Sequence, residues 1–86
     1  MTIKKEMVIR EVGGDWILVP TGDSVLEYNG LFTLSEAGAF IWQHLEQAAS
    51  DEDIVKLMLE EYDVDEQTAR HDTQAFLNEL RSLEII

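Results

Sequence analysis

The residues of this chain that could support catalysis or metal binding are few, and their spacing does not bring them together. The two histidines, His44 and His71, fall on different predicted helices, and neither has a second ligand at a spacing that suits a metal. The acidic run Asp51-Glu52-Asp53 lies where a helix begins and lacks the alternating oxygen ligands of a calcium loop. No phosphate-binding glycine loop and no set of nucleophile, base and oxyanion donor is present. The sequence therefore predicts a protein that is not an enzyme and has no cofactor or metal.

One serine lies in a sequence that resembles the modified site of a carrier protein. Gly22-Asp-Ser-Val-Leu26 is similar to the Asp-Ser-Leu motif that receives phosphopantetheine in acyl carrier proteins, which are also small and acidic. In carriers this serine opens a long helix, whereas Ser24 precedes a pattern that we interpret as a strand and a turn. A small acidic carrier or scaffold protein, acyl-carrier-like at Ser24, is therefore the alternative hypothesis.

The composition is that of one small folded domain. The chain has 86 residues, of which 45% are hydrophobic, and it contains no cysteine for a disulfide or a thiolate metal site. No apolar run approaches the ~18 residues of a membrane span, and the N-terminal residues lack the apolar core of a signal peptide. We expect a cytoplasmic protein with no membrane partner.

The net charge of -12 argues against a nucleic-acid partner, whose phosphates would be repelled. Half of the six basic residues lie in the first ten positions, so the rest of the chain is more acidic than the total indicates. Two interpretations stay open: the charge serves solubility, or it suits a partner or peptide of basic character.

The first 30 residues carry the composition and the turn signals of short strands. Gly13-Gly14 separates two runs that contain β-branched residues, and Asn29-Gly30 follows a third, shorter run. We predict an antiparallel meander of three strands, at about 7–12, 15–20 and 25–28.

The remaining residues repeat apolar side chains at helical spacing in three segments. Thr33 has capping-box spacing with Glu36 at the start of the first helix, where Ser35 is a competing N-cap, and Ser50 and Asp65 are suitable N-caps for the other two helices. We predict helices at about 35–47, 51–62 and 66–83. Because the strands precede the helices, the predicted fold class is α+β.

The last helix has the longest apolar face, formed by Ala69, Thr73, Phe76, Leu77, Leu80 and Leu83. We expect Trp42 and Phe76 to be buried between the helices and the sheet. Asp72 is an acid close to this face; it is expected either to pair with Arg70, Lys56 or a backbone amide, or to contact a bound partner.

Three segments in this order resemble the PqqD family, the pyrroloquinoline quinone synthesis protein D-like peptide chaperones, also called RiPP recognition elements. The similarity covers about residues 15 to 86. It is carried by Leu34, Gly38, Ile41, Trp42, Glu61, Tyr62, Val64, Asp72, Phe76, Leu77 and Leu80. The chain departs from the family's usual glycine-leucine ending, which is replaced here by Arg81-Ser-Leu-Glu-Ile-Ile86.

The resemblance implies a winged-helix-like fold, in which a three-stranded antiparallel sheet is followed by three helices. It also implies a non-enzymatic chaperone that binds the leader segment of a ribosomally synthesised precursor peptide. Such a chaperone presents the peptide to a radical SAM protein or another peptide-modifying enzyme. DNA binding, which some winged helices perform, is disfavoured because the predicted helix 66–83 has more acidic than basic residues.

The predicted binding mode is addition of the leader to an exposed strand edge, with side-chain pockets beside it. We place it between the third predicted strand and the last helix. The same edge could pair with a second copy, so a monomer or an edge-paired homodimer is expected. The predicted peptide-binding residues are Val25, Leu26, Glu27, Tyr28, Ala69, Arg70, Asp72, Thr73 and Phe76.

Overall fold

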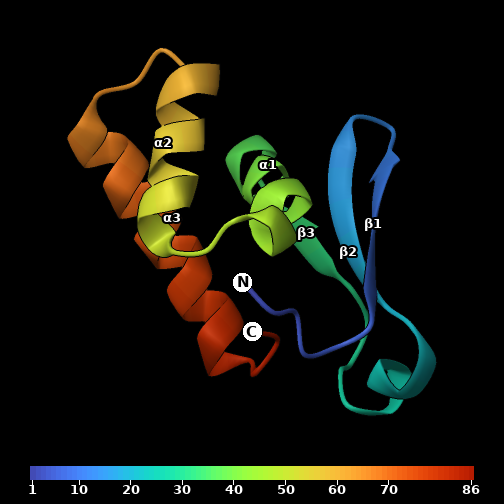
Figure 1. Ribbon diagram of the computed structural model, residues 1–86. Helices are drawn as coiled ribbons and strands as arrows, with labels where there is room; N and C mark the ends of the chain where they lie inside the picture. Colours follow the sequence, from blue (N-terminus) through green and yellow to red (C-terminus); the bar gives the residue numbers. More distant parts are fainter.

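The computed structural model describes residues 1–86 and has a three-stranded antiparallel sheet followed by three helices (Figure 1). The strands follow one another in the sheet in chain order, so the first and third strands are its edges. The strands are β1 (Met7–Val12), β2 (Asp15–Pro20) and β3 (Phe32–Leu34). The helices are α1 (Glu36–His44), α2 (Asp51–Glu61) and α3 (Glu66–Ser82), with short 3-10 helices η1 (Gly22–Leu26) and η2 (Leu45–Gln47). The predicted fold class is confirmed.

The register of the sheet places its side chains in cross-strand rows. Gly13 and Gly14 both have positive φ, as a tight hairpin requires, and they join β1 to β2. On the face that meets the helices, two rows extend across all three strands. The middle row is Ile9, Leu18 and Phe32, and the tip row, nearest the hairpin turn, is Glu11, Trp16 and Leu34.

The third strand was predicted at about 25–28, and that prediction is wrong. Gly22 has a φ of 56°, and the chain after it curls into η1, in which the amides of Glu27 and Tyr28 both donate to the carbonyl of Ser24. Within η1, Val25 is 56% exposed and Leu26 is 92% exposed, so these apolar side chains do not form a strand face. The strand begins six residues after η1 ends, at Phe32.

Each helix begins at a side-chain cap that was predicted. The amide of Gly38 donates to the hydroxyl of Ser35 at 3.0 Å, and the amide of Asp53 donates to Ser50 at 3.4 Å. Asp65 accepts from the amide of Thr68 at 2.7 Å, and this bond lowers the pKa of the Asp65 carboxyl. These bonds satisfy amides that the first turn of a helix leaves unpaired. None of the helices is long and apolar enough to cross a membrane.

The core lies between the sheet and the helices. In Figure 1, α2 and α3 lie side by side, and α1 lies between this pair and the sheet. Leu18 of the middle row is 1% exposed and joins the buried side chains of all three helices. Trp42 is 7% exposed, which confirms its predicted burial, but Phe76 is only half-buried.

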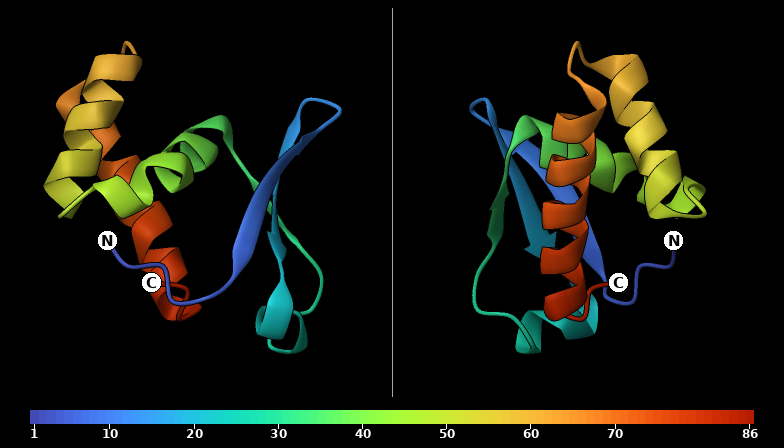
Figure 2. Two further views of the ribbon diagram at one scale, coloured as in Figure 1. Left: turned by 45° about the vertical axis from the view of Figure 1, so that its right-hand side comes forward. Right: turned by 90° about the vertical axis from the view of Figure 1, so that its left-hand side faces the viewer.

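The C-terminal residues are bound back into the core, close to the N-terminus (Figure 2). After α3 ends, the amide of Ile85 donates to the carbonyl of Leu80 at 2.9 Å, and the Ile85 side chain is fully buried. The amide of Lys4 donates to the carbonyl of Ile85 at 2.7 Å, and the hydroxyl of Tyr28 donates to the carbonyl of Leu83 at 2.7 Å. Carbonyls that the helix leaves unpaired are thus satisfied.

This helix ending forces Glu84 into the left-handed region, with a φ of 62°. Glycine is the residue that usually occupies this position after a helix, because it lacks the Cβ that opposes a positive φ. The Glu84→Gly variant should therefore be more stable than Glu84→Ala by about 1 kcal/mol in urea unfolding. Both variants remove the same charge, so only the Cβ separates them. Equal stabilities would contradict the strain at Glu84.

Candidate functional site

An apolar groove of about 380 Å³ lies between β3 and α3. Its floor is made of the buried side chains of Leu18, Leu80 and Ile85. Eight of its eleven lining residues are hydrophobic, and its one charged residue is Glu79. The remaining lining residues are Leu31, Phe32, Thr33, Leu34, Ser35, Phe76 and Leu83.

The edge of β3 that borders this groove is unpaired. β3 pairs with β2 on one side only, over three residue pairs, and no strand lies on its other side. Figure 2 shows β3 at the margin of the sheet, with α3 passing the helix-facing side. Phe32 and Leu34 are half-buried on that side, whereas Thr33 is exposed. A strand edge beside an apolar groove is the arrangement that an added peptide strand requires.

The predicted site residues from 25 to 28 lie outside this groove. Val25 and Tyr28 line a separate shallow depression together with residues of β2 and of the loop before β3. Leu26 lines no cavity, and Glu27 forms an ion pair with Lys5 at 2.6 Å. The prediction that residues 25–28 form the strand that pairs with the peptide is wrong, because the chain forms η1 there and not a strand.

The predicted residues of α3 divide between its two faces. Ala69 and Thr73 are fully buried in the core and cannot contact a peptide. Arg70 is committed to α2, since its guanidinium pairs with Glu52 and also donates to Glu66 at 3.0 Å. These ion pairs raise the pKa of the Arg70 guanidinium.

Phe76 and Asp72 lie on the accessible side of α3. Phe76 lines the β3–α3 groove and also an adjoining depression that it shares with Asp72 and with residues of α1. Asp72 is half-exposed, and the polar partner that it contacts is the ring of His71, at 3.5 Å. Of the nine predicted residues, only Phe76 therefore lies in the groove itself.

The predicted set of site residues omits several exposed or half-buried residues that line the groove, which are Leu31, Phe32, Leu34, Glu79 and Leu83. A signal for the strand was present. Phe32-Thr33-Leu34 alternates apolar and polar residues shortly after Gly30, as a half-buried strand would.

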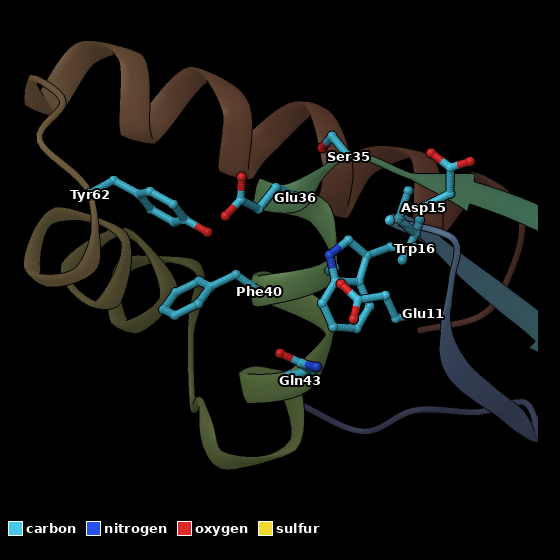
Figure 3. Close-up of a pocket in the computed structure, with 11 residues that line it drawn as sticks. Glu11, Asp15, Trp16, Ser35, Glu36, Phe40, Gln43 and Tyr62 are labelled. Carbon is cyan, nitrogen blue, oxygen red and sulfur yellow. The ribbon is translucent and has the colours of Figure 1, made fainter.

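A second cavity, of about 630 Å³, opens at the tip row of the sheet, and we call it the tip pocket (Figure 3). It lies between the tip row, the first two turns of α1 and Tyr62, the residue that follows α2. Figure 3 shows Phe40 and Tyr62 on one side of it and Trp16 with Glu11 on the other. The rings of Phe40 and Tyr62 meet edge to face, with centroids 5.4 Å apart.

Three carboxylates line the tip pocket, and no basic residue does. They belong to Glu11, Asp15 and Glu36, and none of them forms an ion pair. Burial raises the pKa of the Tyr62 hydroxyl, and the negative charges of Glu36 and Glu61 raise it further. Glu36 is directed toward this hydroxyl in Figure 3.

Metal and carrier chemistry find no support in this geometry. No group of three His, Asp or Glu side chains is placed to hold a metal ion. Ser24 is 3% exposed and lies in a five-residue 3-10 helix rather than at the start of a long one. A buried hydroxyl is not accessible to a modifying enzyme, so the carrier hypothesis at Ser24 is not supported.

A free strand edge beside an apolar groove, in an α+β domain of this size, is the architecture of a small peptide-binding domain. The family model of coenzyme PQQ synthesis protein D (PqqD) matches residues 15–86. The chain belongs to this family, as its sequence motifs predicted.

Two solved structures share the fold. TbiB1 in complex with the TbiA(beta) leader peptide matches with a TM-score of 0.72 and 28% identity, over 99% of this chain and 93% of that chain. Lasso peptide synthetase B1 complexed with the leader peptide matches with a TM-score of 0.69 and 20% identity, over 94% and 89%. The comparison with curated proteins found no match.

The hydroxyl of Thr73 is buried on the core side of α3 without a hydrogen-bond partner, and this placement can be tested by substitution. Thr73→Val removes this hydroxyl while keeping the shape of the side chain, so it should raise the free energy of unfolding by roughly 1 kcal/mol. Thr73→Ser keeps the hydroxyl and loses a methyl group, and it should lower that free energy by about 1 kcal/mol. Chemical denaturation measures both. A destabilised Thr73→Val would mean that the hydroxyl is bonded.

Proposed function

We propose that this protein binds the leader segment of a ribosomally synthesised precursor peptide and presents it to a maturation enzyme, without itself catalysing a reaction. The leader adds as a fourth strand to the free edge of β3, and its apolar side chains enter the groove between β3 and α3. The observation that carries this proposal is the unpaired three-residue edge beside a groove lined by eight hydrophobic residues. TbiB1, which shares 28% of its sequence with this chain, was solved with a leader peptide bound.

The groove suits a short apolar motif rather than a fully polar peptide. Its exposed and half-exposed rim offers Leu31, Phe32, Leu34, Phe76 and Leu83 to a ligand. Burial of one leucine-sized side chain contributes about 1.5–3 kcal/mol. Backbone bonds to β3 contribute about 0.5–1.5 kcal/mol each and fix the register of the peptide. The groove therefore selects for apolar side chains, and the strand edge selects for an extended conformation.

The maturation enzyme is proposed to be a radical SAM protein or another peptide-modifying enzyme, as is implied by the family resemblance. Its docking must leave the β3–α3 groove free for the leader. A loaded groove would also prevent a second copy from pairing with β3, so we propose that the protein acts on the peptide as a monomer.

Two exposed leucines give a matched test of the binding site. Leu31 is 54% exposed on the rim of the groove, and Leu26 is 92% exposed on η1, outside it. Peptides can be selected from a random display library on the full chain and their affinities measured by calorimetry. Leu31→Glu should weaken binding by about tenfold, because it removes apolar contact and places at the rim a charge that the bound peptide would desolvate. Leu26→Glu, with the same change of charge, should leave binding unchanged.

Hydrogen exchange locates the peptide independently of these substitutions. Bound peptide should protect alternate amides of β3, since the donors of a strand point alternately to its two sides. Thermal melts of both leucine variants would establish that they fold as the wild type does. Equal losses from Leu31→Glu and Leu26→Glu, or protection confined to η1 or α2, would contradict the proposed groove.

A further inference from the structure

We propose that the tip pocket binds a lysine or arginine side chain of the same peptide, next to the segment that pairs with β3. This inference rests on the proposed function and adds a second, charge-selective subsite to it. Figure 3 shows the pocket that would receive this side chain.

The charge of the tip pocket is uncompensated. Glu11, Asp15 and Glu36 line it, all three side chains are exposed, and no lysine, arginine or histidine is among its eleven lining residues. Some other acids of the chain have a basic partner, as Glu27 has Lys5, Glu52 has Arg70 and Asp51 has Arg81. A cationic side chain supplied by the peptide would complement the charge that the protein leaves unpaired here.

The walls of the pocket distinguish it from a solvated acidic surface. Trp16, Phe40 and Tyr62 are half-buried and present their rings to the cavity. Aromatic faces attract ammonium and guanidinium groups through their quadrupole, and a lysine or arginine stem is apolar enough to pack against such rings. A long side chain with an apolar stem and a cationic head therefore matches both the walls and the rim.

Tyr62 reports the same negative potential. The pKa of its hydroxyl is raised by burial first, and then by the carboxylates of Glu36 and Glu61. The part of this shift that comes from the two carboxylates would favour a cation at the same place, whereas burial disfavours charge of either sign. The hydroxyl also stays protonated at neutral pH, so it adds no further charge.

The pocket continues the groove along the chain. Leu34 and Ser35 line both cavities, so the two hollows meet where β3 ends and α1 begins. An extended peptide advances about 3.3 Å per residue. A peptide that pairs with β3 and continues past Ser35 therefore brings a side chain toward the tip pocket.

The first test uses a side-chain probe and does not depend on β3. N-acetyl-arginine methylamide is titrated into the ¹⁵N-labelled full chain, with N-acetyl-citrulline methylamide, its neutral counterpart of equal size, in parallel. The arginine probe should shift the signals of the Trp16 indole N–H and the Gln43 amide. The affinity of the citrulline probe should be lower by a factor of about five or more. Equal effects of the two probes would overturn the charge selectivity.

A matched pair of double variants tests the carboxylates. Glu11→Gln with Glu36→Gln should weaken binding of the arginine probe by about fivefold to tenfold. Asp23→Asn with Glu60→Gln removes the same charge from two exposed residues that line no cavity, and it should change nothing. Equal effects of the two double variants would mean that only the net charge of the protein matters, which would overturn the site.

The second test uses peptides selected from the random library. Those selected on the wild type should carry lysine or arginine at a fixed spacing from the β3-paired segment, and this enrichment should vanish in selections on Glu11→Gln with Glu36→Gln. Peptides that protect β3 but show no such enrichment would overturn this inference and leave the proposed function intact. An arginine probe that binds the tip pocket, without any peptide that protects β3, would refute the proposed function and the shared-peptide arrangement together.

Discussion

A three-stranded sheet must bury one face, and the helices of this chain cover that face only in part. The middle row of the sheet is sealed, because Leu18 packs against buried residues of the helices and Ile85 closes the core from the C-terminal side. The tip row and the β3 edge lie at the limits of this cover, and they remain partly open. Both hollows thus follow from the same shortage of covering surface, which a domain of this size cannot avoid.

Two ion pairs between side chains join α3 to the start of α2. Arg70 and Arg81 of α3 pair with Glu52 and Asp51 at the start of α2. Exposed pairs of this kind contribute little stability each. They use two of the chain's six basic residues, and none of the six lines the tip pocket, so its three carboxylates have no base among the lining residues.

Much of the architecture could be predicted from the sequence, because the strongest signals were local. The Gly13-Gly14 turn and the caps at Ser35, Ser50 and Asp65 lie where the residue types indicated, and these positions bound five of the six main elements. Local signals failed for β3. Val25-Leu-Glu-Tyr28 has strand-forming residues, but the positive φ of Gly22 and the turn chemistry of Asp23 and Ser24 favour η1 instead.

The candidate site was harder to predict than the fold, because a groove is a property of two elements and not of one. The apolar stripe of α3 was visible, but sequence spacing does not say which part of it meets α2 and which part meets the sheet. Ala69 and Thr73 belong to the first part, and Phe76 and Leu83 to the second.

The energetics explain why two hollows would serve a leader better than one. A three-residue edge offers few backbone bonds, and ordering a flexible peptide costs about 2–5 kcal/mol. Apolar contacts in the groove must offset that cost, but such contacts are compatible with many peptide sequences. A charge-selective pocket next to the groove would therefore distinguish among peptides that the groove alone binds equally well.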